Sequence, residues 1–208
     1  MNQAKPNCPD WAESFGFDEY GAYADMIFDV ALDHRQRFRW CPPGQFEMIT
    51  DARNPVRYAL FDLGFWLADS PLTNHSTPCK LPLTGLTLEG AVSTANALGC
   101  LVPSYMQLTY AACNFQDETT WWVNDLLWSH ANTNGVMRPN YTSKPNKHGF
   151  YDLRGNVWEW GVMSREANAA MLCGGSCMSN ISFYGFQRRS PARVLPDEPI
   201  GVRLLAPP

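Results

Sequence analysis

The chain has 208 residues, of which 45% are hydrophobic and only 17% are charged. This length suits one domain with a sizeable core, and the composition excludes disorder driven by charge. Lysine and arginine number 16 against 20 for aspartate and glutamate, a net charge of −4 without a block of like charges, so a nucleic-acid partner is not expected. The 8 tryptophans, 16 prolines and 15 glycines are typical of a loop-rich chain held together by aromatic side chains.

The amino-terminal residues and the cysteines indicate the cellular compartment of the protein. The start of the sequence lacks the charged and then apolar layout of a signal peptide. An odd number of cysteines, 7, leaves at least one thiol unpaired in a monomer, which favours reduced thiols. No apolar stretch approaches the roughly 18 residues of a membrane span. We expect a cytoplasmic protein without membrane insertion.

The amino-terminal third predicts strands and a turn. Apolar positions in residues 18–33 recur without a clean period, so this stretch fits a short helix or a strand. Two prolines and a glycine predict a tight turn at residues 42–44. Phe46 and Met48 then alternate with polar neighbours, as one face of a strand does. We expect this strand to form a hairpin with residues 58–67.

Two helices are predicted from their caps and apolar faces. Thr87 can cap the first and Gly99 can end it, and its expected buried face consists of Leu88, Val92, Ala95 and Leu98. Ser104 and Gln107 form a capping box for the second, whose expected buried stripe consists of Leu108, Ala111, Ala112 and Phe115. A long stretch without periodicity follows as far as residue 147. Long loops of this kind are usually functional or organised by a ligand.

Few residues form a known catalytic pattern. The four histidines are scattered, and no nucleotide-binding or hydrolase motif occurs. Cys173 and Cys177, separated by two glycines and a serine, form the closest thiol pair. Such a pair fits a copper(I) site, a disulfide or two small buried residues, and the last of these is the common case.

Residues 151–160, which read YDLRGNVWEW, suggest a metal. Asp152 and Glu159 offer two hard carboxylates, and Gly155 permits a turn that aims carbonyl oxygens inward. Calcium prefers such mixed shells of carboxylate and carbonyl oxygen. The alternative is a turn with solvated carboxylates and buried tryptophans.

The longer run GFYDLRGNVWEW at residues 149–160 resembles the signature of the formylglycine-generating enzyme family, also called the sulfatase-modifying factor domain. Further motifs of that family are matched in the same order, at residues 38–48, 64–69, 101–112, 174–176 and 200–204. The resemblance implies an α+β, loop-rich C-type lectin-like fold. It assigns residues 35–208 to this single domain and leaves residues 1–34 as an extension that packs on or next to it.

The family resemblance also implies metal sites. A structural calcium ion would be held by the side chains of Asp152 and Glu159 and by the carbonyls of Gly155 and Val157. A second calcium site would fall near Asn132 and the carbonyl of Thr133, although its later ligands have no match in this chain.

The catalytic residues of the family are not matched. Active members bind copper(I) through two cysteines, whose positions are occupied here by Ser179 and Tyr184. Copper(I) selects soft sulfur ligands, so a pair of hydroxyls would not hold it. Cys173 and Cys177 lie at shifted positions and are the remaining candidates for a displaced copper site.

The resemblance therefore favours a catalytically inactive module that binds a protein or a small molecule. Its expected contact residues lie in the carboxyl-terminal segment and are Ser179, Asn180, Phe183, Tyr184, Phe186, Gln187 and Arg188. Aromatic and arginine side chains mixed with serine and asparagine are typical of contact surfaces. Variable proteins of diversity-generating retroelements use this domain and diversify this segment. The opposing interpretation places Phe183 and Phe186 in the core, with solvated arginines around them.

Two alternatives stay open. One is a copper-dependent oxidase of the formylglycine-generating type that acts on a cysteine thiol through Cys173 and Cys177. The other is an accessory subunit of a phage or bacterial assembly, docked to a partner through residues 18–33.

Overall fold

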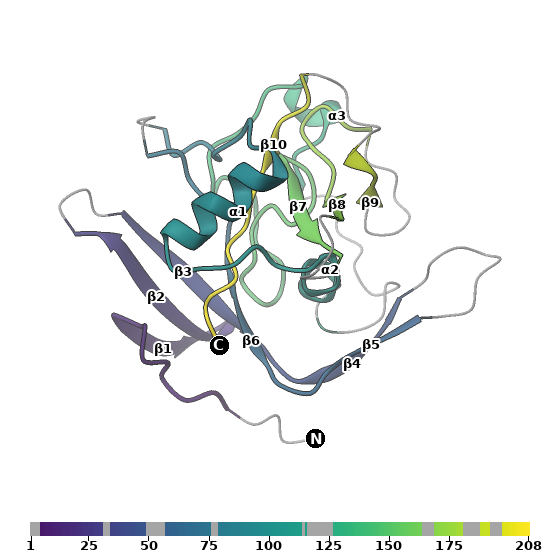
Figure 1. The fold of residues 1–208 in the computed structure, drawn as a ribbon. Coiled ribbons are helices and arrows are strands. Elements are labelled where there is room, and N and C mark those ends of the chain that lie inside the picture. The colour runs from purple at the N-terminus through teal and green to yellow at the C-terminus, as the bar shows by residue number, and fades with distance from the viewer. Residues whose placement is uncertain are drawn as a thin grey trace.

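The computed structural model describes residues 5–30, 34–48, 57–75, 79–113, 115, 127–163, 169–180, 188–191 and 197–208. Within these ranges the chain forms two four-stranded sheets, a two-stranded ribbon and three helices, joined by long irregular segments (Figure 1). None of these helices is long and apolar enough to cross a membrane.

The first sheet contains most of the amino-terminal part of the chain. Its antiparallel strands follow the order β1 (Ser14–Asp18), β2 (Gly21–Asp29), β3 (His34–Cys41) and β6 (Phe65–Ala68). The stretch that fitted a helix or a strand is therefore a strand over residues 21–29, and residues 31–33 lie outside the described ranges. Because β2 pairs with β3, the expected boundary between residues 34 and 35 falls within one continuous sheet.

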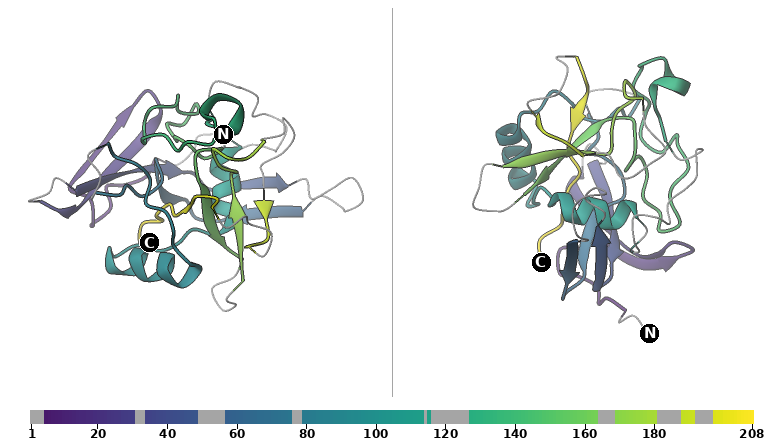
Figure 2. Two further views of the ribbon diagram at one scale, coloured as in Figure 1. Left: turned by 90° about the horizontal axis from the view of Figure 1, so that it is seen from above. Right: turned by 90° about the vertical axis from the view of Figure 1, so that its right-hand side faces the viewer.

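The predicted hairpin forms with a shorter partner than expected, because residues 65–67 of the expected stretch lie in β6 and pair with β3. β4 (Gly44–Met48) pairs antiparallel with β5 (Arg57–Phe61), and Phe46 is fully buried, as its alternation predicts. Seen from above, this ribbon and the first sheet extend to opposite sides of the second sheet (Figure 2).

The second sheet collects the carboxyl-terminal strands. Its order is β10 (Ile200–Gly201), β7 (Trp158–Val162), β8 (Ala170–Cys173) and β9 (Arg188–Arg189). β10 runs parallel to β7, while the other neighbours are antiparallel. The WEW motif thus lies in a central strand.

Helix α1 (Leu88–Ala97) has the predicted cap but a different buried face. The Thr87 hydroxyl accepts from the Gly90 amide at 3.1 Å, and Gly99 adopts φ +69° beyond the helix end. Ala91 and Ala95 are fully buried, whereas Val92 is 36% exposed, so its assignment to the buried face is wrong. The helix packs through small side chains four residues apart, and the next position is rotated by about 100° away from them.

Helix α2 (Tyr105–Ala112) agrees with the sequence in both cap and face. Gln107 N donates to the Ser104 hydroxyl at 3.2 Å, and Ser104 N donates to the Gln107 side chain at 2.9 Å. Leu108 and Ala111 are fully buried, and Phe115 is partly buried against the same cluster. In the stretch predicted to lack periodicity, the described residues 127–147 contain the short helix α3 (His130–Thr133).

The last described segment closes the core between both sheets. Leu204 O accepts from Ala68 N at 2.9 Å, and Val202 O accepts from Leu72 N at 2.8 Å. Val202 and Leu204 are fully buried together with Phe38 of β3. Residues 202–204 therefore form an internal strand-like segment rather than a tail.

Candidate functional site

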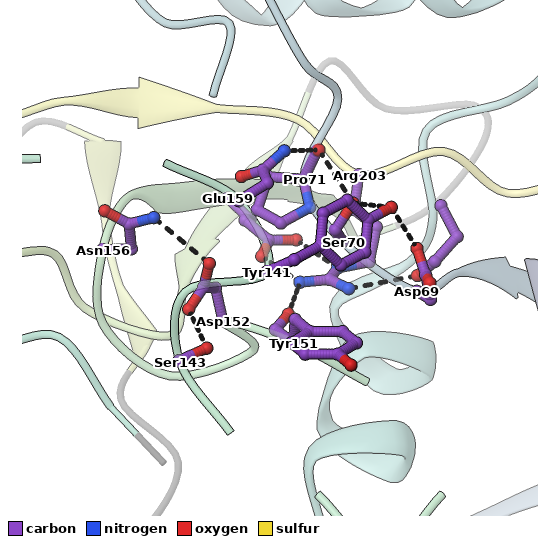
Figure 3. Close-up of polar contacts among 12 residues, drawn as sticks. Asp69, Ser70, Pro71, Tyr141, Ser143, Tyr151, Asp152, Asn156, Glu159 and Arg203 are labelled. Atoms are coloured by element: carbon purple, nitrogen blue, oxygen red, sulfur yellow. Dashed lines mark hydrogen bonds and ion pairs between the residues drawn. The ribbon is translucent and has the colours of Figure 1, made fainter. Parts of the chain in front are cut away.

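A buried ion pair lies at the centre of the molecule. Arg203, which follows β10, donates from Nε and Nη2 to the two carboxylate oxygens of Glu159 at 2.9 and 2.8 Å. The same guanidinium donates to Ala68 O at 3.0 Å and to Tyr151 O at 2.7 Å (Figure 3). Arg203 and Glu159 are only 0% and 2% exposed, so their charges balance each other without solvent.

A second buried carboxylate holds the long loop against the first sheet. Asp69 is 3% exposed, and its Oδ1 accepts from the Tyr141 hydroxyl at 2.9 Å and from Gln36 Nε2 at 3.1 Å. Burial raises the pKa of Asp69 to about 6, although the Tyr141 hydrogen bond acts in the opposite direction. Tyr141 adopts the left-handed φ of +66°, and the Ser70 hydroxyl donates to its phenolic oxygen at 3.0 Å. The loop is therefore held in a conformation that non-glycine residues seldom adopt.

Asp152 is the third buried carboxylate. It accepts from the Ser143 hydroxyl at 2.6 Å and from Asn156 Nδ2 at 3.2 Å (Figure 3). Burial raises its pKa to about 6, and the Ser143 hydrogen bond opposes this change. Both hydrogen-bond donors are neutral, so the charge of Asp152 has no directly bound cation among the described residues.

Asn156 joins three segments. Its amide donates to Trp128 O at 2.7 Å, its side chain exchanges two hydrogen bonds with the backbone of Arg138 at 2.9 and 3.0 Å, and its carbonyl accepts from Cys177 N at 2.9 Å. The adjacent Gly155 has φ +81°, and a Cβ there would lie 2.2 Å from Trp128 O. Only glycine permits this close approach of two backbones.

The start of the predicted binding segment is anchored at this junction. The Ser179 hydroxyl accepts from Ser176 N at 3.0 Å, and Ser179 O accepts from His130 N at 3.2 Å. The Thr133 hydroxyl donates to Cys177 O at 3.0 Å. The turn over residues 176–179 is thus fixed against α3.

The other end of the segment is anchored in the second sheet. Arg189 donates to the Glu198 carboxylate at 2.7 Å, and its guanidinium lies 4.8 Å from the centroid of the Trp158 ring. Trp158 Nε1 donates to the same carboxylate at 3.2 Å. Both flanks of residues 181–187 are therefore held by hydrogen bonds and aromatic contact.

The predicted contact residues occupy different environments. Ser179 is buried and its hydroxyl belongs to the turn, Asn180 is exposed, and Arg188 is half-buried in β9. The remaining predicted contacts, which lie outside the described residues, are Phe183, Tyr184, Phe186 and Gln187.

The residues predicted to bind calcium fit the ion unequally. Asp152 offers a buried carboxylate with neutral partners, which suits a cation, whereas Glu159 already shares both oxygens with Arg203. The Gly155 carbonyl accepts from Val157 N at 2.7 Å. Asp152 therefore fits best as the charged ligand, and Glu159 would have to share its carboxylate with the guanidinium.

The second predicted calcium position involves residues of α3. Asn132 Oδ1 accepts from Ser129 N at 2.9 Å, and Asn132 Nδ2 donates to Leu127 O at 2.9 Å. The Thr133 side chain is 2% exposed. The Asn132 amide thus caps the helix, and a calcium ion would have to displace the Ser129 contact.

The two candidate copper ligands are both buried. Cys173 in β8 and Cys177 in the following turn are each 1% exposed, and burial raises the pKa of both thiols. The Cys177 thiol donates to Gly135 O at 3.4 Å. Copper(I) requires thiolates, so these surroundings do not fit that ion.

Sequence reasoning missed Arg203, Asp69, Tyr141, Ser143 and Asn156 as parts of the site. A usable signal was present for two of them. Arg203 lies in the apolar run IGVRLLA, and Asp69 follows the apolar strand FWLA. A charge in such a run is buried with a partner, although the run does not say which partner.

Replacing Glu159 by Gln should destabilise the protein strongly, because Arg203 would keep a buried charge without a counterion. We expect a loss of about 3–5 kcal/mol in the free energy of unfolding. Urea denaturation in the presence of a chelator measures this without a contribution from calcium. Glu13→Gln, at an exposed position, should change the free energy by no more than about 0.5 kcal/mol, and equal effects of the two variants would contradict this role.

The pKa of Asp69 predicts a pH dependence of stability. Its folded-state pKa of about 6 lies above the unfolded value, so its contribution is present below pH 4 and is lost as pH rises through 6. Relative to Asp69→Asn, the wild type should lose on the order of 3 kcal/mol of unfolding free energy between pH 4 and 7. Parallel pH dependences in the two proteins, measured by urea denaturation, would show that this carboxyl does not titrate as expected.

Solved structures share this architecture. Treponema denticola variable protein 1 matches with a TM-score of 0.70 at 15% identity, covering 88% of this chain and 99% of that one. PvdO from Pseudomonas aeruginosa matches at 0.62 and 13% identity, covering 93% and 98%. CarF matches at 0.57 and 17% identity, covering 82% and 98%. At these identities the likeness establishes the C-type lectin-like fold alone.

Sequence comparison gives the family. No curated protein matches the chain significantly. The model of the sulfatase-modifying factor enzyme 1-like domain matches residues 73–207, which is more than half of the sequence. This range includes Asp152, Asn156, Glu159 and Arg203, the residues that organise the buried polar interior. The chain therefore belongs to the family of sulfatase-modifying factor enzyme 1-like domains.

Proposed function

We propose that this protein is a catalytically inactive binding module whose ligand contacts lie between residues 179 and 189. The observation that carries this proposal is the anchoring of that segment at both ends. Ser179 is tied to Ser176 and α3 on one side, and Arg189 is tied to Glu198 and Trp158 on the other. Binding residues are commonly placed on loops that a rigid scaffold positions.

The composition of the segment supports the same function. Residues 180–188 read NISFYGFQR, which combines aromatic, amide and arginine side chains in a short span. Aromatic rings and arginine contribute a large share of binding energy at contact surfaces. A structural neighbour is named a variable protein, and we include in the proposal that this segment is diversified by a retroelement. A template repeat with adenine-specific differences in the neighbouring DNA would support that part.

The proposal also includes a structural calcium ion with Asp152 as its charged side-chain ligand. The support is a buried carboxylate held by Ser143 and Asn156, two neutral donors. Calcium there would neutralise Asp152 and stiffen the turn of residues 152–157, to which the start of the binding segment is attached through Cys177.

Calcium should raise the melting temperature of the wild type, and a chelator should lower it. Ligand binding to the folded state stabilises it by about 2.7 kcal/mol at a concentration 100 times the Kd. Asp152→Asn should abolish this response, while Asp10→Asn, at an exposed position, should preserve it. A calcium response that survives in Asp152→Asn, or no response in the wild type, would contradict the assignment.

The binding segment can be tested with a triple variant that replaces Phe183, Tyr184 and Phe186 by Ala. Binding to glycan and protein arrays identifies a ligand for the wild type, and titration calorimetry then compares the variants. Loss of aromatic contacts worth about 2 kcal/mol or more should weaken binding over tenfold without changing the melting temperature. Phe17→Ala, an exposed position in β1, is the matched control. Unchanged binding by the triple variant, or its unfolding, would contradict the proposal.

A further inference from the structure

We propose that Arg138 and Trp128 form a carboxylate-binding subsite at the edge of the binding segment. This inference rests on the proposed binding function and adds the chemical class of one part of the ligand. Arg138 and Trp128 are not among the residues predicted to bind calcium or copper.

Arg138 has a fixed backbone and an unused charge. Asn156 holds both its amide and its carbonyl, at 2.9 and 3.0 Å. Over the described ranges, its guanidinium makes no ion pair or hydrogen bond, and Nε is covered from solvent without an acceptor. Its Cζ lies 5.9 Å from the centroid of the Trp128 ring. Other arginines of the chain use the same group for carboxylates, as Arg37, Arg39, Arg189 and Arg203 do at 2.7 to 2.8 Å.

Trp128 supplies a second hydrogen-bond donor that is covered from solvent without an acceptor among the described residues. Its carbonyl is held by Asn156 N at 2.7 Å, so the residue is positioned by the same asparagine. Its indole Nε1 is covered from solvent and has no acceptor in the part of the chain that the structure describes. A buried donor without an acceptor costs free energy that a bound oxygen restores. Two such donors on contacting side chains therefore favour one shared acceptor group.

The pair lies beside the start of the binding segment. Cys177 N donates to the backbone carbonyl of Asn156. The same asparagine bonds Trp128 through its backbone amide and Arg138 through its side chain. The Cys177 thiol donates to Gly135 O at 3.4 Å, three residues before Arg138 in the chain. The exposed Asn180 follows Cys177 by three residues, so the start of the binding segment is attached to the asparagine that positions the pair.

The single positive charge of the two side chains favours a carboxylate as the ligand. One guanidinium and one neutral indole N–H offer a single positive charge, which matches a carboxylate better than a doubly charged phosphate. Because the Arg138 side chain forms no hydrogen bond with the described residues, rotating it to admit an anion breaks none of theirs. The subsite would therefore bind the carboxylate of an acidic ligand through the guanidinium fork and the indole N–H.

The test is an NMR titration of the indole N–H resonances with sodium acetate at constant ionic strength. Trp128→Phe assigns the Trp128 signal, which should shift saturably in the wild type. Arg138→Gln should remove the shift, and it should fold normally because the native guanidinium makes no hydrogen bond or ion pair with the described residues. Lys147→Gln makes the same charge change at an exposed position of the same loop and should leave the titration unchanged.

An absent shift, or an equal shift in Arg138→Gln, would overturn the subsite. Equal responses to acetate, sulfate and phosphate would overturn the preference for carboxylate. The result is separable from the binding segment, because acetate should still shift Trp128 in the variant that lacks the aromatic residues 183, 184 and 186. Loss of the subsite with intact array binding would remove this inference alone.

Discussion

The guanidinium of Arg203 makes hydrogen bonds to three separate parts of the chain at once. It meets Glu159 in the second sheet, the carbonyl of Ala68 in the first, and the carbonyl of Tyr151 in the irregular segment between them. A buried charge tolerates little displacement, because any lost contact leaves an unsolvated group. This constraint fixes how the two sheets and the intervening loop lie against one another.

Buried polar groups in the loops also depend on specific hydrogen-bond partners. Asn156 and Asp152 adopt positive φ angles, and side-chain to backbone hydrogen bonds replace the ladders that regular structure would provide. Irregular backbone can be buried only when its polar groups find such partners. The rigidity that a binding surface needs thus comes from a few buried polar residues rather than from long strands.

The sequence predicted the parts of this fold that depend on neighbours in the chain. The capping box at Ser104 and the hairpin around Phe46 follow from local patterns, and the family motifs give the architecture. Arg203 and Glu159 are 44 residues apart, and Tyr141 and Asp69 are 72 apart, so no local pattern pairs them. Val92 was misassigned because periodicity cannot show that α1 packs through alanines. The calcium ion and the contact surface stay predictions.

The internal position of residues 202–204 affects how the protein can fold. Arg203 bonds to Ala68 across 135 residues of sequence, and the neighbouring backbone fills the space between the sheets. Contacts this distant form slowly, since a long loop must close before they give any stabilisation. On the ribosome the core cannot be completed before residue 204 emerges. Until then the nascent chain would expose side chains such as Trp66 and Trp158, which are buried in the finished core, and exposed apolar surface of this kind favours aggregation.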